Sequence, residues 1–187
     1  MMQITTLQQG RPEDVSDRIP VEVACYDLLD QLHIPYERVD HEEAATIEAC
    51  EAVDAVLGTE ICKNLFLCNR QKTQFYLLLI EGKKVFKTKY LSAQLGCSRL
   101  SFASPEDMVE LLGVTPGSAK VLALMNDPDN RVQLVIDRPV TKQPYIGCHP
   151  CKNTSSLKIP TQDILDKVLP AVHHSPIYVE LPVEEEA

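Results

Sequence analysis

Six consecutive apolar residues, Phe75–Ile80, place the strongest constraint on how this chain folds. The run contains no charged residue, so a β-strand formed by it would be buried on both faces. The turn signal Glu81-Gly82-Lys83 follows directly and ends the strand. The run therefore predicts a strand inside a sheet that other elements cover on both sides.

Helical patterns precede and follow this strand. Most have a start or stop signal, such as a capping hydroxyl, a proline in the first turn or a glycine after the last turn. The clearest is Ser104-Pro105-Glu106-Asp107, which has the residues of a capping box. The predicted helices cover residues 20–33, 46–57 (capped by Thr46), 88–95 (capped by Thr88), 104–112 and 161–169.

Further strands are predicted from short apolar or alternating runs between turn residues. These runs cover residues 36–40, 61–68, 132–136 and 177–181, and an apolar run at 121–125 follows the loop at 113–120. Residues 138–154 are rich in Pro, Gly and Cys and are predicted to be irregular. Because helices and strands do not alternate regularly, the fold class is α+β rather than a doubly wound sheet.

The length of 187 residues fits one domain. We expect a flexible N-terminal arm at residues 1–18, a domain at 19–182, and an acidic tail at 183–187 that begins shortly before Glu184-Glu185-Glu186. Hydrophobic residues make up 44% of the chain and charged residues 24%, which is typical of a globular protein.

The formal net charge of −9 excludes broad non-specific binding of nucleic acid, because the phosphate backbone would repel the chain. Contact with RNA would need a local basic patch. The N-terminus has no pattern of a secretory signal, and no apolar run is long enough to cross a membrane. Seven cysteines, an odd count, then indicate reduced thiols and a cytoplasmic location.

Two polar residues, Lys63 and Asn64, interrupt an otherwise apolar strand. Lys63 either reaches solvent along its aliphatic stem or points into a site for an anion. Asn64 should face the other side of the strand unless the strand is bulged. The loop from Gly113 to Ser118 is either a plain turn or a place where backbone N–H groups meet an oxyanion or phosphate.

The segment Gly147–Thr154, GCHPCKNT, is the densest group of chemically active residues. Cys148 and Cys151 could belong to a zinc site, but no second C-x-x-C pair completes it. They could form a redox pair, although no helix N-terminus is indicated there. The segment could also be a pocket loop in which His149 and Asn153 are polar contacts, or it could be purely structural.

Taken in order, several motifs resemble one family. These motifs are His41…Thr46, Cys62-Lys63-Asn64-Leu65-Phe66-Leu67, Gly113-Val114-Thr115-Pro116-Gly117-Ser118, Asn126-Asp127, and Gly147-x-His149-Pro150-x-x-Asn153-Thr154. They are similar to those of the YbaK-like family, the deacylases related to the editing domain of prolyl-tRNA synthetase. The most similar group in it is the stand-alone ProX/PrdX group. The resemblance covers about residues 20–180.

The resemblance implies an α+β fold with a mixed, partly barrel-like sheet flanked by helices. It implies hydrolysis of the ester between alanine and the tRNA for proline, without a metal or other cofactor. The implied partner is the acceptor end of a mischarged tRNA. A transient contact with prolyl-tRNA synthetase is compatible with the resemblance. Neither a membrane nor DNA is an expected partner.

The resemblance also implies roles for individual residues. Backbone N–H groups around Gly117 and Ser118 would stabilise the oxyanion, and Lys63 would bind the phosphate or ribose of the terminal adenosine. His149 would position the amino group or cover the pocket. The attacking water would be oriented with help from the ribose hydroxyl of the substrate. The implied substrate-binding residues are Thr46, Asn64, Gly113, Gly147, Cys148, Pro150, Asn153 and Thr154, with Cys148 and, from the second helix, Thr46 and Ile47 at the pocket wall.

One position departs from the family pattern, because Val121 stands where relatives commonly have proline after the glycine loop. The alternative function is therefore a non-catalytic module of the same fold that binds tRNA or a synthetase. A zinc or redox protein built on Cys148 and Cys151 is the remaining alternative.

Overall fold

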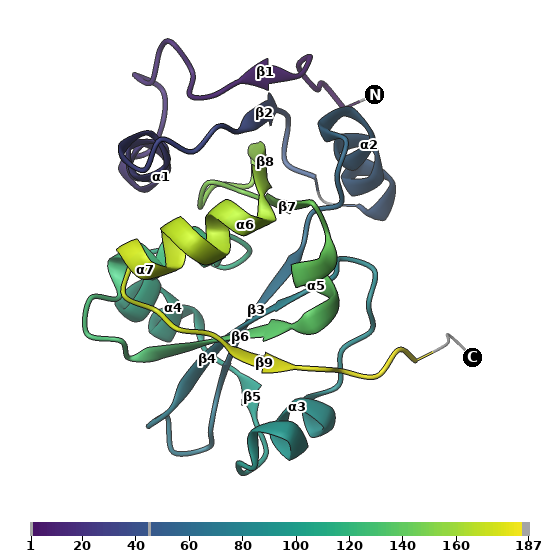
Figure 1. Ribbon diagram of the computed structural model, residues 1–187, viewed down its shortest axis with the longest axis vertical. Coiled ribbons are helices and arrows are strands. Elements are labelled where there is room, and N and C mark those ends of the chain that lie inside the picture. The colour runs from purple at the N-terminus through teal and green to yellow at the C-terminus, as the bar shows by residue number, and fades with distance from the viewer. Residues whose placement is uncertain (1, 45, 185–187) are drawn as a thin grey trace.

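The computed structural model describes residues 2–44 and 46–184. These residues form two open sheets, with the four-stranded sheet above the five-stranded sheet in Figure 1. The four-stranded sheet has the order β1 (Gln8–Gln9), β2 (Glu37–Asp40), β8 (Ser155–Pro160), β7 (Tyr145–Cys148). The five-stranded sheet has the order β5 (Ser101–Phe102), β3 (Lys63–Cys68), β4 (Phe75–Ile80), β6 (Val132–Asp137), β9 (Ile177–Val179).

The predicted central strand is confirmed, because all six residues of β4 are buried. β4 pairs antiparallel with β3 and parallel with β6, so it lies in the middle of the sheet. Alternate side chains enter two separate apolar clusters. Leu77 and Leu79 belong to the larger cluster, and Leu78 and Ile80 to the smaller one. Both faces of the sheet are therefore covered, as the apolar run indicates.

The predicted helices form close to their predicted limits. They are α1 (Pro20–Gln31), α2 (Ile47–Leu57), α3 (Thr88–Leu95), α4 (Pro105–Leu112) and a C-terminal run of α6 (Thr161–Asp163), the π-helical η2 (Ile164–Val168) and α7 (Leu169–Ala171). Two further helices were not predicted, the 3-10 helix η1 (Val121–Asn126) and α5 (Arg138–Lys142). The capping box of α4 is present, with both the Ser104 and the Asp107 side chains bonded. Thr46 caps α2 by accepting from the Ala49 N–H at 3.1 Å.

The structure corrects three predictions. Thr88 does not cap α3, because Lys87 occupies the cap position and Thr88 is the first helical residue. Residues 138–154 are not irregular throughout, since they contain α5 and β7. The mixed sheet is not partly closed into a barrel; in the described residues it is divided into two sheets. The α+β class itself is confirmed.

The segment predicted as a flexible arm runs along the four-stranded sheet. Gln8 pairs with Arg38 across β1 and β2. At the end of the segment, the Arg18 guanidinium contacts the Asp40 carboxylate at 2.9 Å and the Glu22 carboxylate at 2.9 Å. The limits of the domain stay a prediction, and residues 185–187 of the tail lie outside the described residues. No helix in the described parts of the chain has the length and apolar character needed to cross a membrane.

Candidate functional site

Gly147 brings the two sheets into direct contact. It forms a parallel bridge with Ile61, and its carbonyl accepts a hydrogen bond from the Cys62 N–H at 2.9 Å. A Cβ at position 147 would lie 2.6 Å from the Glu60 carbonyl oxygen, which is closer than real Cβ atoms approach. The absence of a side chain therefore lets β7, and the loop that follows it, lie against the start of β3.

Asn64 fixes a second loop on the same strand. Its Oδ1 accepts from the Val121 N–H at 2.9 Å, and its Nδ2 donates to the Cys62 carbonyl at 3.2 Å. The end of the 113–120 loop is thus tied to β3. Lys63 lies on the opposite face, since successive side chains of a strand alternate. Lys63 is an exposed residue, and its Nζ donates to the Lys84 carbonyl at 3.0 Å.

The glycine loop itself offers fewer backbone donors than the resemblance implies. Gly117 is exposed, has a φ of +83°, and has open space where a Cβ would lie. Ser118 is buried, but its N–H already donates to the Thr115 carbonyl at 3.0 Å. The Ser118 amide is therefore engaged inside the loop, whereas the loop surface at Gly117 stays open to a ligand.

His149 is held as a neutral hydrogen-bond acceptor. Its Nδ1 lies 2.7 Å from the Ser155 carbonyl oxygen, and because a carbonyl only accepts, we assign the proton to Nδ1. Nε2 then carries the lone pair. Burial, and after it the charge of Lys120, lower the pKa of His149 to about 3. The ring is consequently uncharged near neutral pH and is a weak base.

Ser156 and His41, which the motifs do not mark as site residues, form a hydrogen-bonded chain with His149. Ser156 Oγ lies 3.1 Å from His149 Nδ1 and 2.8 Å from His41 Nε2, so it connects the two rings. The ring centroids of His41 and His149 are 5.9 Å apart. His41 Nδ1 lies 2.7 Å from the Glu42 carbonyl, which leaves Nε2 to accept from the serine hydroxyl. Sequence patterns do not connect His41 with Ser156, because they lie 115 positions apart.

The two cysteines of the GCHPCKNT segment do not pair with each other. Cys148 is fully buried at the end of β7, and burial raises the pKa of its thiol to about 12. The Cys151 sulfur instead lies 3.5 Å from the sulfur of Cys25 on α1. Within residues 2–44 and 46–184, no group of three or more His, Cys, Asp or Glu side chains is arranged to hold a metal.

The remaining predicted site residues either lie near the two loops or have a structural role in the fold. Asn153 Nδ2 contacts the Glu43 carboxylate, and Pro150 is buried. Thr46 is occupied as the cap of α2. Gly113 ends α4 in the left-handed conformation, with a φ of +65°, and the structure gives it this capping role.

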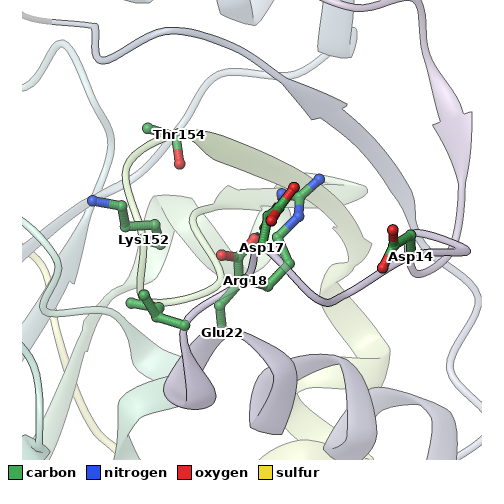
Figure 2. Close-up of a pocket in the computed structure, with 7 residues that line it drawn as sticks. Asp14, Asp17, Arg18, Glu22, Lys152 and Thr154 are labelled. Atoms are coloured by element: carbon green, nitrogen blue, oxygen red, sulfur yellow. Dashed lines mark hydrogen bonds and ion pairs between the residues drawn. The ribbon is translucent and has the colours of Figure 1, made fainter.

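A polar cavity of about 340 Å³ opens beside the far end of the GCHPCKNT segment (Figure 2). Its lining residues come from the N-terminal segment, the start of α1 and the segment itself, and they are Asp14, Asp17, Arg18, Ile19, Glu22, Lys152 and Thr154. Figure 2 shows Lys152 extending away from Arg18. Because Arg18 is already paired with Glu22 and Asp40, this cavity has no unpaired guanidinium to offer an anion.

Comparison with known proteins places this arrangement in a family. The profile of the family described as "Aminoacyl-tRNA editing domain" matches residues 41–167. The prolyl-tRNA editing protein ProX of Acetoanaerobium sticklandii is 30% identical over 143 residues, which is 76% of this chain and 87% of that protein. The prolyl-tRNA synthetase associated domain-containing protein 1 of Danio rerio is 30% identical over 174 residues, which is 88% of this chain and 94% of that protein.

A solved structure described as a candidate trans-editing enzyme for prolyl tRNA synthetase shares the fold. It superposes with a TM-score of 0.62 at 17% identity and covers 89% of this chain and 99% of its own. The profile match spans well over half of the chain and contains the strand with Asn64, the glycine loop, and residues 147–150, which we call the GCHP loop. The chain belongs to the aminoacyl-tRNA editing domain family.

Proposed function

We propose that this protein is a trans-editing deacylase that hydrolyses alanyl-tRNA for proline. The observation that carries the proposal is the convergence of two loops on the start of β3. The Val121 N–H bond to Asn64 holds the glycine loop there, and the Cys62–Gly147 bond holds the GCHP loop. Family membership and the names of the ProX and synthetase-associated relatives support an editing activity on prolyl-tRNA.

The chemistry asked of such a site is modest, because an aminoacyl ester is already activated. The protein has to hold the ester and stabilise the tetrahedral oxyanion. In the proposed arrangement the open backbone at Gly117 faces the reacting carbonyl. The neutral His149 accepts a hydrogen bond from the substrate amino group through Nε2, and the ribose hydroxyl orients the water. A strong general base is not required, which agrees with the low pKa of His149.

Alanine would be selected by size. A synthetase site built for proline cannot reject the smaller alanine by more than the energy of the missing methylenes, so a second sieve is needed. Cys148, next to His149, is proposed to support the wall of that sieve from below its surface, because the residue is fully buried. Ile47, which is 76% exposed at the start of α2, and the adjacent Thr46 are proposed at its rim.

The tRNA end would meet charged residues outside this centre. Lys63 is an exposed residue whose ammonium is bonded only to a backbone carbonyl among the described residues, so we expect it to bind a phosphate or ribose oxygen as a point charge. A transient contact with prolyl-tRNA synthetase and a cytoplasmic location belong to the same proposal, because the substrate is produced by that enzyme.

A panel of mischarged tRNAs tests the proposal. Purified protein should release alanine from alanyl-tRNA for proline and leave the prolyl ester intact, and Lys63→Ala should weaken tRNA binding. If alanyl-, prolyl- and cysteinyl-tRNA all stay intact, the deacylase function is wrong. The second candidate, a tRNA-binding module without turnover, is favoured by Val121 and by the engaged Ser118 amide. Binding of tRNA without release of any amino acid would establish it.

A further inference from the structure

Lys120, the last residue of the 113–120 glycine loop, is a buried lysine for which the described residues provide no counterion. Only 8% of the residue is exposed, and it lies just before η1. Among residues 2–44 and 46–184, no carboxylate lies within 4.0 Å of its ammonium and no hydrogen-bond acceptor is found for it. Lys84 is buried to the same degree, at 7% exposure, but its ammonium contacts the Asp137 carboxylate at 2.6 Å.

The groups around Lys120 cannot supply a negative charge at neutral pH. Its titratable neighbours are His149 and the thiols of Cys148, Cys151, Cys62 and Cys50. Burial raises the pKa of both Cys148 and Cys62 to about 12, so these thiols stay protonated. Burial also lowers the pKa of Lys120 itself. Among the described residues, none of these neighbours offers a negative charge to the Lys120 ammonium, although the lysine is buried close to His149.

A buried ammonium without an acceptor lowers the stability of the fold, and a ligand that supplies an acceptor would offset this cost. The proposed substrate brings a neutral ester carbonyl that becomes an oxyanion in the transition state, and the chain otherwise has few donors for this charge. The Ser118 amide is engaged with Thr115. The backbone of Lys120 is fixed in place, because the next amide, Val121 N–H, is bonded to Asn64. Asn64 thus acts as a positioning residue for Lys120.

Resting on the proposed deacylase function, we propose that the Lys120 ammonium is a further catalytic group that contacts the carbonyl oxygen of the scissile ester and stabilises the oxyanion. The water oxygen attacks the carbonyl carbon, and the C=O electron pair moves to the oxygen that faces Lys120. When that pair returns, the bond from carbon to the ribose oxygen breaks. The ribose oxygen takes the proton that the water loses, and Lys120 keeps its own protons. The products are free alanine and tRNA.

Two substitutions at this position test the role of the charge. Lys120→Met keeps a long apolar side chain and removes the cation, so the single-turnover rate of alanyl-tRNA hydrolysis should fall on the order of 100-fold. The KM should change by less than about threefold, because the lost contact is made mainly in the transition state. Lys120→Arg keeps the charge and should recover about tenfold of the lost rate. Lys89→Met, on the exposed surface of α3, is the matched control and should react like the unmodified protein.

Thermal unfolding separates this role from a structural one. Removal of an uncompensated buried charge should leave the Tm of Lys120→Met unchanged or raise it. A lower Tm in Lys120→Met would mean that the lysine supports the fold, and it would overturn the proposal. Unmodified turnover in Lys120→Met, or equal losses in Met and Arg, would overturn it as well while leaving the deacylase function intact. Inactivity of the unmodified protein on every mischarged tRNA would instead reject the deacylase function and this role together.

Discussion

Gly147→Ala should destabilise the protein strongly, although alanine is usually a mild replacement within a strand. The new Cβ would meet three backbone atoms, the Glu60 carbonyl oxygen at 2.6 Å, the Glu60 carbonyl carbon at 3.0 Å and Ile61 Cα at 3.0 Å. None of these belongs to a flexible side chain that could rotate away. The chain before β3 must therefore move away from β7.

The size of the effect follows from what this movement breaks. Overpacking a tightly packed contact costs about 1–3 kcal/mol. Loss of the bond from Cys62 N–H to the Gly147 carbonyl, 2.9 Å long, adds about 0.5–1.5 kcal/mol. The smaller backbone entropy of alanine in the unfolded chain returns about 0.5–1 kcal/mol. We expect a net loss of about 0.5–4 kcal/mol in the free energy of unfolding.

Urea unfolding at equilibrium measures this loss, and Gly10→Ala is the matched control. Gly10 has a φ of +65° and open space where its Cβ would lie, so the steric cost is absent. The left-handed backbone penalty of about 1–2 kcal/mol applies instead, and the same entropy gain of about 0.5–1 kcal/mol offsets part of it. Deacylation should also fall more in Gly147→Ala than in Gly10→Ala, because the GCHP loop moves relative to Asn64. Unmodified stability and activity in Gly147→Ala would refute the close-contact argument.

Two further perturbations test the centre. The pKa of His149 is about 3 in the folded protein and near 6.5 when unfolded, so its contribution to stability is complete above pH 6.5 and is lost as the pH falls toward 3. As the pH is lowered from 6.5 to 4, the free energy of unfolding of His149→Gln should therefore fall less than that of the unmodified protein, with a difference on the order of 2 kcal/mol. If the urea midpoints of the two proteins change with pH in parallel, the expectation is wrong. Asn64→Ala leaves the buried Val121 N–H without its acceptor, so the free energy of unfolding in urea should fall by about 1–3 kcal/mol. The variant should also lose most of its turnover. If stability and turnover both match the unmodified protein, Asn64 has no positioning role.

Local signals predicted much of the framework. The capping box at Ser104 and the apolar run Phe75–Ile80 both depend on neighbouring residues alone, and both form as predicted. β8 was not predicted, because Ser155 and Ser156 resemble loop residues in the sequence. Both are fully buried in the structure, since polar partners from distant segments, Asp40 among them, bond their hydroxyl groups. Non-local partners of this kind leave no periodic pattern.

In the candidate site, too, local sequence patterns predicted the segments, whereas contacts between distant residues could not be predicted. The motifs indicated the segments that meet, but not which side chain of each segment faces the centre. Asn64 faces the glycine loop, whereas Lys63 faces away from it, and only the register of β3 decides between them. Lys120 carries no motif at all. Its significance depends on burial and on the absence of a carboxylate among the described residues around it, which are properties of the folded chain.

Buried basic side chains have different surroundings at the site and away from it. Lys84 is paired with Asp137, and His174 Nε2 lies 3.0 Å from the Asp127 carboxylate, so each has an acidic partner within the fold. Lys120 and His149 lie close together, and the charge of one lowers the pKa of the other. A fold selected only for stability would replace one of them by an apolar residue of similar size. Their presence at the junction of the two loops is a local inconsistency that the proposed function would explain, because an aminoacyl ester would supply a carbonyl acceptor for the ammonium and an amino-group donor for the imidazole.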